Sequence, residues 1–287
     1  MRFAAVWLVV ALIGGCGGGD GADRVSPATS SASTTTTTAA LVPPSTPDGI
    51  HLLATTAPAG FDVEGARWIE MERPDGRTQL AAIFVPDGTG PFPTVVYLHG
   101  VSGLGLLQLQ WAPRLAAAGY LVLAGCYLAA DAARASANPT AFVPCAGLPP
   151  NDRSDGATIA TGYRALVSTA RVLGPAKQGS IGMVGVSFGA GVALNAADPS
   201  VAAIVADSGY GTGPASAVDA PVLFLGGTAD PTVAHADVVA FEQALRAGGK
   251  QVESHYYDGA GHVVTLIDAT TDDATRRAVT FLDQHLN

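Results

Sequence analysis

Charged residues are scarce in this sequence, and cations are the scarcer kind. They make up 14% of the 287 residues, with 15 Lys and Arg against 24 Asp and Glu, so the formal net charge is -9. Nucleic-acid binding requires clustered cations opposite the phosphates, and no run of Lys and Arg is present. The composition therefore argues against a nucleic-acid partner. The acidic balance otherwise indicates little beyond solubility.

Cysteine is also rare, with three residues in the chain. Neither these nor the histidines have the spacing of a metal-ligand set. The stretch GGTADP does not match a dinucleotide-binding fingerprint. We therefore expect neither a metal nor another cofactor. The apolar run at residues 3–13 reaches about half of the roughly 20 residues that a membrane-spanning helix requires.

Residues 1–15 instead have the features of a secretory signal peptide. Arg2 precedes the apolar run, and Gly14 and Gly15 lie between that run and Cys16. The stretch IGGC resembles a bacterial lipobox, in which cleavage before the cysteine frees it for lipid attachment. We expect lipidation of Cys16 and anchoring in the bacterial cell envelope, on the outer face of the cytoplasmic membrane. The alternative is a plain secretory signal, which would give a secreted protein that is not attached to the membrane.

Residues 16–48 are rich in Gly, Ser, Thr, Ala and Pro and have few large apolar residues. Such a segment cannot bury a core, so we predict a disordered linker. The folded domain is then expected at residues 49–287. Its two cysteines, Cys126 and Cys145, are predicted to form a disulfide, because paired thiols are favoured outside the cytoplasm. Two buried free thiols are the alternative.

Short apolar segments alternate with longer amphipathic or Ala-rich ones through the rest of the chain, which predicts a doubly wound, mostly parallel α/β sheet. The turn residues Pro74, Asp75 and Gly76 separate the first two segments and predict an antiparallel hairpin. The expected strands are 66–71, 79–86, 94–100, 120–125, 181–186, 201–207, 221–227 and 253–259. The expected helices are 108–118, 156–173, 188–196, 235–247 and 272–285.

Active sites of such sheets lie at the carboxyl ends of the strands. The candidate residues at or just after the ends of predicted strands are His99, Ser187, Asp207, Asp230 and His262. Ser187 is the central residue of Gly-Val-Ser-Phe-Gly, which matches the G-x-S-x-G nucleophile motif in its required position between a strand and a helix. A helix N-cap in a glycine-rich turn is the alternative explanation.

A serine nucleophile requires a base, and the base requires an orienting carboxylate. His262, in the loop after the last predicted strand, is the predicted base, because His99 precedes Gly100 where an oxyanion loop is expected. Asp230 is the predicted acid because it fits the Ser, Asp, His order of this fold with the better spacing, 43 residues after Ser187 and 32 before His262. Asp207 is the competing acid.

Two amides are needed to stabilise an oxyanion. The N–H of Phe188, next to the predicted nucleophile, and the N–H of Val101 are predicted to supply them. The stretches YLHGVSG, GVSFGAG, FLGGTADPTV and DGAGH resemble the dienelactone hydrolase-like branch of the α/β-hydrolase superfamily. The resemblance implies a cofactor-free hydrolase of carboxylic esters or lactones. Name-giving members use a cysteine nucleophile, and Ser187 at that position favours general esterase chemistry.

We therefore predict a serine hydrolase that cleaves short-acyl esters through an acyl-enzyme on Ser187. An acyltransferase with the same three residues and a non-catalytic surface lipoprotein on a hydrolase scaffold are the alternatives. Only residues 208–220 separate two late strands, which is too short for a cap domain. We expect an open site, bounded by the Cys126–Cys145 loop and the loop after His99. The oligomeric state is not predicted.

Overall fold

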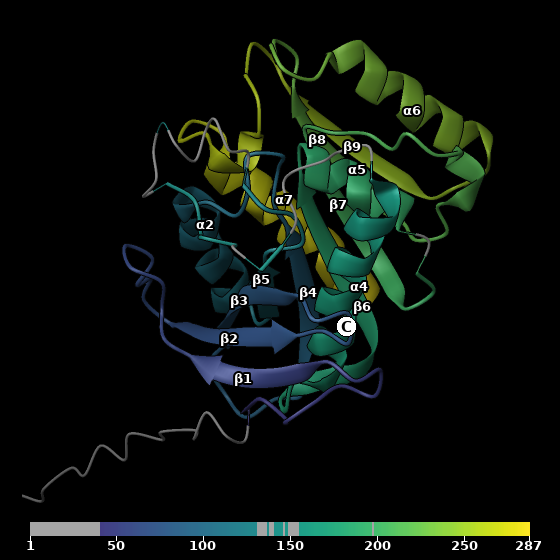
Figure 1. The fold of residues 1–287 in the computed structure, drawn as a ribbon. Coiled ribbons are helices and arrows are strands. Elements are labelled where there is room, and N and C mark those ends of the chain that lie inside the picture. The colour runs from purple at the N-terminus through teal and green to yellow at the C-terminus, as the bar shows by residue number, and fades with distance from the viewer. Residues whose placement is uncertain (1–40, 131–136, 138–140, 146, 149–154, 197) are drawn as a thin grey trace, which may run out of the picture. The chain divides into compact units, whose positions relative to one another are not determined.

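The computed structural model describes residues 41–130, 137, 141–145, 147–148, 155–196 and 198–287 (Figure 1). The predicted signal peptide, Cys16 and the linker up to residue 40 lie outside the described residues. Within the described part, no helix is both long and apolar enough to cross a membrane.

The described elements build a mixed sheet with helices on both faces, which confirms the predicted α/β-hydrolase fold. The strands are β1 (His51–Thr55), β2 (Ala66–Glu72), β3 (Thr78–Phe84), β4 (Phe92–Leu98), β5 (Leu121–Gly125), β6 (Ala176–Val186), β7 (Val201–Asp207), β8 (Val222–Gly227) and β9 (Val252–Tyr257). The helices are α2 (Leu106–Ala117), α4 (Gly156–Val172), α5 (Phe188–Asn195), α6 (His235–Ala247) and α7 (Thr271–Leu286). The 3-10 turns are η1 (Ala215–Ala217) and η2 (Val264–Leu266).

The strand order is β1-β2-β3-β5-β4-β6-β7-β8-β9 (Figure 1). The pairs from β1 to β5 are antiparallel, and the pairs from β5 to β9 are parallel. The predicted hairpin joins β2 and β3, where Arg73 N–H donates to the Arg77 carbonyl and Gly76 has a φ of +79°. The parallel strands therefore bring the segments that follow β4, β6, β7, β8 and β9 to one edge.

Two hydrophobic clusters lie on opposite faces of the sheet. Alternate residues of β4 belong to different clusters: Val96 and Leu98 lie in one, and Val95 and Tyr97 lie in the other. Buried residues of α4, α5 and α6 belong to the first cluster, and those of α2 and α7 to the second. This two-sided burial explains why the central strands are almost wholly apolar in sequence.

The N-terminal part of the domain differs from the prediction in two ways. Strand β1 was not predicted, because it is an edge strand in which only Leu52 is buried, so its sequence lacks a clear apolar pattern. Packing also begins before the predicted boundary at residue 49. Leu41 is buried in the core, and Ser168 Oγ of α4 donates to Asp48 Oδ2 over 2.8 Å. Residues 41–48 are therefore part of the folded domain.

Candidate active site

Ser187 lies at the sharp turn between β6 and α5, with φ of 53° and ψ of -121°. Its N–H donates to the Asp207 carbonyl over 2.8 Å, which ties the turn to the end of β7. A Cβ at Gly185 would collide with the Gly189 carbonyl, and a Cβ at Gly189 would collide with the Leu98 carbonyl. The two glycines of the motif are therefore required by close backbone approach, and the turn presents the serine hydroxyl at the edge of the sheet.

His262 links Ser187 to Asp230. His262 Nε2 lies 2.9 Å from Ser187 Oγ, and His262 Nδ1 lies 2.7 Å from Asp230 Oδ2. A neutral imidazole with its proton on Nδ1 donates to the carboxylate and accepts from the serine hydroxyl. The Asp230 side chain is 3% exposed, whereas that of His262 is 22% exposed. The arrangement can remove the hydroxyl proton while the nucleophile stays open to a substrate.

Asp230 is held in place by its own loop. Its Oδ1 accepts from the backbone N–H groups of Thr232 and Val233 over 2.7 and 3.0 Å, which leaves Oδ2 directed at His262. Both carboxylate oxygens are therefore hydrogen-bonded despite near-complete burial, as a buried carboxylate requires. Of the two aspartates considered from the sequence, Asp230 is the one in contact with His262.

Asp207 is fully buried and binds the loop that follows His262. Its Oδ1 accepts from Ser208 Oγ and Val264 N–H over 2.8 and 3.1 Å, and its Oδ2 accepts from the N–H and Oγ1 of Thr265 over 2.9 and 2.6 Å. Burial raises the pKa of Asp207, although these hydrogen bonds act against that shift. Asp207 thus holds the His262 loop against β7, a role that the sequence did not suggest.

His99 is fully buried at the end of β4, and its Nδ1–H donates to the Gly100 carbonyl over 2.7 Å. Burial lowers the pKa of His99 to about 4, so the ring stays neutral near pH 7. The imidazole stacks on the Tyr127 ring with centroids 4.4 Å apart. His99 is therefore a structural residue of the loop after β4, in keeping with its predicted place there.

The two residues predicted to supply oxyanion amides lie beside Ser187. Phe188 is the first residue of α5, directly after the serine, and Val101 lines the same cavity as Ser187 and Phe188. A helix N-terminus directs its free amides and the positive end of its dipole at the turn, which favours a developing negative charge. The site can thus place the Ser187 hydroxyl beside the amide groups at the N-terminus of α5.

A cavity of about 500 Å³ opens at Ser187 and runs between α4 and α5. Its apolar wall includes Ile159, Val192 and Phe188, and Arg164 is the charged residue among the described lining residues. Val101 brings the loop after His99 into the lining, as expected, and most of the other described lining residues lie on or next to α4 and α5. The predicted contribution of the Cys126–Cys145 loop falls largely outside the described residues. No sequence motif indicated that Arg164 and Ile159 line the cavity, since their position there depends on how α4 packs against α5.

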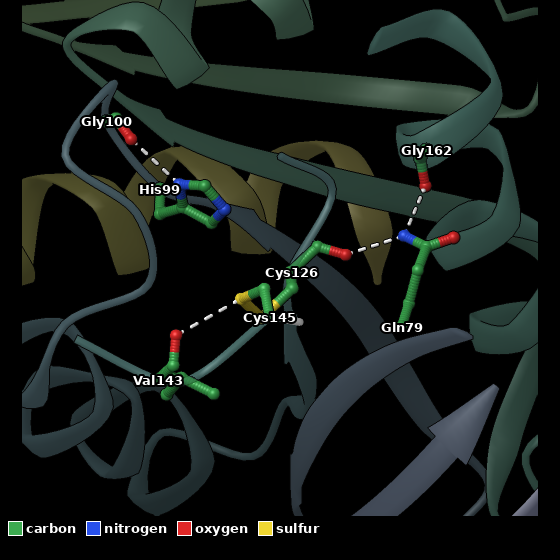
Figure 2. The surroundings of a disulfide bond; sticks show 7 residues. All are labelled: Gln79, His99, Gly100, Cys126, Val143, Cys145 and Gly162. Carbon is green, nitrogen blue, oxygen red and sulfur yellow. Dashed lines mark hydrogen bonds between the residues drawn. A yellow bond between two sulfur atoms is a disulfide. The ribbon is translucent and has the colours of Figure 1, made fainter. Parts of the chain in front are cut away.

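The structure joins Cys126 and Cys145 in a disulfide with a Cα–Cα distance of 6.0 Å (Figure 2). Cys126 directly follows β5, and the bond lies near the end of β4. No cluster of three His, Cys, Asp or Glu side chains suited to a metal occurs within the described ranges.

The fold and the Ser187, His262 and Asp230 arrangement are those of the α/β-hydrolase class. A model of the dienelactone hydrolase family matches residues 80–285. The chain therefore belongs to the dienelactone hydrolase family, a family of hydrolases, as the sequence motifs predicted.

Other comparisons find more distant similarity. Over 86 residues the chain is 41% identical to acyl-coenzyme A thioesterase 5 of Mus musculus, but this covers 30% of the chain and 19% of that protein. A dienelactone hydrolase-like promiscuous phosphotriesterase from metagenomic libraries is 18% identical with a TM-score of 0.63, over 77% of this chain and 98% of that one. An esterase of Pyrococcus furiosus is 18% identical with a TM-score of 0.61, over 81% and 97%. Both solved structures share the fold.

Proposed function

We propose that the chain is a serine esterase that hydrolyses short-acyl carboxylic esters through an acyl-enzyme on Ser187. One observation carries this proposal: a continuous hydrogen-bonded series from Ser187 Oγ through His262 to Asp230, with distances of 2.9 and 2.7 Å. A serine in a glycine-rich turn without catalytic role would not need a base and a buried carboxylate aligned behind it. Membership of a hydrolase family supports the same conclusion.

In the proposed reaction, His262 Nε2 accepts the proton of Ser187 as Oγ attacks the ester carbonyl. The Asp230 carboxylate stabilises the imidazolium and keeps its Nδ1–H directed away from the substrate. The carbonyl oxygen becomes an oxyanion that accepts from the N–H groups of Phe188 and Val101. His262 then donates its proton to the leaving alcohol, and the acyl group stays on Ser187.

Water completes the cycle by the same steps in reverse. His262 Nε2 accepts a proton from water as its oxygen attacks the acyl carbonyl, and the collapse of the second oxyanion returns the proton to Ser187 Oγ. Thioesters react through the same carbonyl chemistry. They are a second substrate class to assay, because part of the chain is similar to a protein named as an acyl-coenzyme A thioesterase.

The test of this proposal is Ser187→Ala. We expect ester hydrolysis to fall by several orders of magnitude, because the nucleophile is lost while the fold is kept. A fluorophosphonate probe should label the parent enzyme on Ser187 and leave the variant unlabelled. Ser168→Ala is the matched control, since that serine binds Asp48 on the outer side of α4. Full activity in a folded Ser187→Ala protein would refute the proposal and leave the non-catalytic scaffold as the explanation.

We also propose that the domain is held at the cell envelope by lipid on Cys16. The signal-like residues 1–15 and the Gly- and Thr-rich segment after Cys16 support it. Cell fractionation of the full chain against Cys16→Ser tests it: the parent should sediment with membranes, and the variant should be released. Equal membrane association of both would contradict lipid anchoring.

A further inference from the structure

We propose that the Cys126–Cys145 disulfide positions the oxyanion loop, so that reducing it lowers turnover and leaves the nucleophile, base and acid in place. The oxyanion loop is defined here as residues 99–105, which connect β4 to α2 and contain Val101. The inference rests on the proposed function, because it assigns a catalytic consequence to the geometry of that loop.

The segment that leaves β5, residues 126–130, contacts the oxyanion loop at both ends. The hydroxyl of Tyr127 donates to the His99 carbonyl over 2.7 Å, and the Tyr127 ring stacks on the His99 ring at an interplanar angle of 26°. At the other end, Gly103 lies so close to Ala130 that a Cβ on Gly103 would be 2.7 Å from the Ala130 Cβ. The outgoing segment is therefore packed and hydrogen-bonded to the loop.

The returning segment, residues 141–145, pairs with the same loop as a short piece of sheet. Gly105 and Phe142 form an antiparallel bridge. Val143 N–H donates to the Leu104 carbonyl over 2.8 Å, and Leu106 N–H donates to the Ala141 carbonyl over 3.1 Å. The oxyanion loop is thus contacted by both segments of the disulfide-bonded loop.

The disulfide joins these two segments to each other and to the sheet. It connects residues 19 apart in sequence, at the base of the loop (Figure 2). On the outgoing side, Gln79 Nε2 donates to the carbonyls of Cys126 and Gly162 over 2.6 and 3.1 Å, which fixes Cys126 between β3 and α4. The sulfur–sulfur bond attaches the returning segment to Cys126, so this segment is held at the same fixed point.

The other parts of the site are held by elements outside this loop. Ser187 is fixed by β6 and α5, Asp230 by its own turn after β8, and the His262 loop by Asp207. The oxyanion loop nevertheless touches the nucleophile, since a Cβ on Gly100 would lie 3.3 Å from the Ser187 Cβ. A shift of this loop therefore changes the oxyanion site and leaves proton transfer between Ser187 and His262 intact.

The expected effect follows from how strongly acyl transfer depends on oxyanion donors. Loss of one donor costs on the order of 10²–10³ in kcat, and a misplacement of about 1 Å costs roughly 10². We expect reduction to lower kcat by about 10- to 100-fold and to change KM by no more than about twofold, since the interaction is made in the transition state. Because disulfides form outside the cytoplasm, the enzyme would reach full turnover only after export.

The first experiment compares the oxidised and dithiothreitol-reduced full chain on a p-nitrophenyl ester, with near-UV circular dichroism to verify tertiary packing. The Cys126→Ala/Cys145→Ala double variant is the control. It keeps Cys16, and it should have the low kcat of the reduced enzyme and no response to dithiothreitol. An unchanged kcat in a folded, fully reduced protein would overturn the inference.

A second variant tests the same link without breaking the disulfide. Tyr127→Phe removes one hydrogen bond to the oxyanion loop and keeps the stacked ring, so kcat should fall by about 3- to 10-fold. The pH at which kcat/KM is half-maximal should stay unchanged, because His262 is untouched. Tyr120→Phe is the matched control: that hydroxyl bonds to Asp283 at the opposite end of β5, and its loss should leave kcat unchanged.

Equal kcat values for Tyr127→Phe and the parent would refute the link between this loop and catalysis, even if the reduced protein unfolds. Failure of the proposed function would appear differently. In that case the oxidised Ser187→Ala enzyme would retain activity, whereas failure of this inference alone leaves a serine-dependent esterase that is insensitive to reduction.

Discussion

At the scale of single residues, two aspartates that follow strands of the same sheet have different partners. Asp230 bonds to the His262 imidazole, whereas Asp207 bonds to the backbone and hydroxyl groups of the loop after His262. The sequence presents both as acids at strand ends. The order and spacing along the chain favour Asp230 as the acid, but they do not reveal that Asp207 binds the loop after His262. In that loop Val263 has the left-handed conformation, with a φ of 62°.

We expect Asp230→Asn to lower kcat far more than Asp207→Asn. An amide at residue 230 favours the wrong histidine tautomer, an effect worth roughly 10⁴ in a serine protease with this arrangement. An amide at residue 207 disturbs the buried hydrogen bonds to Thr265 and costs about 1–3 kcal/mol of unfolding free energy, with a smaller effect on kcat. Steady-state kinetics and urea unfolding of both variants measure this. A larger kcat loss in Asp207→Asn would reverse the assignment.

The buried His99 makes stability depend on pH. Its folded pKa is lowered to about 4, below the ordinary value of 6.5, because burial disfavours the charged ring. The unfolded chain therefore binds the proton more readily than the folded chain. The contribution of neutral His99 to the unfolding free energy is full above pH 6.5 and is lost as the pH falls toward 4. This difference in pKa corresponds to a loss of on the order of 3 kcal/mol of unfolding free energy across that pH range.

We accordingly expect His99→Asn to flatten the fall in unfolding free energy between pH 6.5 and pH 4. Asn can still donate to the Gly100 carbonyl but does not titrate. The measurement is urea unfolding at several pH values, with the exposed His51→Asn variant as the control that keeps the parent slope. If the unfolding free energies of His99→Asn and the parent fell equally with pH, another group would be the cause of the loss of stability in acid.

At the scale of elements, the sequence predicted each described α-helix to within two residues. It also predicted every parallel strand, although β6 begins at Ala176, five residues before its predicted start at 181. Their signals are local: apolar runs covered on both faces, and helices with one buried side. Strand β1 and the packed residues 41–48 could not be found this way, because Leu41 and Asp48 acquire their meaning only from contacts with residues distant in the chain. The helix residues of the cavity lining, such as Ile159 and Arg164, were missed for the same reason, since their position depends on the packing of α4 against α5.

The turn between β6 and α5 depends on the absence of a side chain at Gly189. Gly189→Ala should lower the unfolding free energy by about 1–3 kcal/mol, because the added methyl collides with the Leu98 backbone, which cannot move away cheaply. Gly156→Ala, at the first residue of α4, is the control: its added methyl meets no atom within 4 Å. Thermal unfolding of the two variants distinguishes them. An equally stable Gly189→Ala protein would show that β4 and α5 can separate without cost.

At the scale of the whole molecule, the family and the arrangement of Ser187, Asp230 and His262 were predictable because this fold places its functional groups at strand ends. The residues that line the cavity around that site were less predictable. The segment between β7 and β8 is the exception, since its length alone limits what it can form. It contains a single 3-10 turn, Ala215–Ala217, and no cap domain.

Among the described residues, the cavity at Ser187 is lined by α4, α5 and the loops around Ser187. The cavity of about 500 Å³ has apolar residues near Ser187 but also the polar lining residues Arg164, Asn195 and Thr212. Each CH₂ of an acyl chain that stays in water forgoes roughly 0.8 kcal/mol. Lengthening the acyl chain beyond the apolar part of the cavity should therefore add little to binding.

We expect kcat/KM on p-nitrophenyl esters to peak at short acyl chains and to fall for long ones. The rate should also change smoothly across the solubility limit of the substrate, because the segment between β7 and β8 contains no cap that would have to open at an interface. Ile159→Trp adds bulk to the apolar wall of the cavity that opens at Ser187, so it should move the maximum toward still shorter chains. Ile267→Trp, outside the lining residues of the cavity, should leave it in place. A maximum at long chains, or a jump in rate above the solubility limit, would indicate a lipase-like site and contradict the short-acyl proposal.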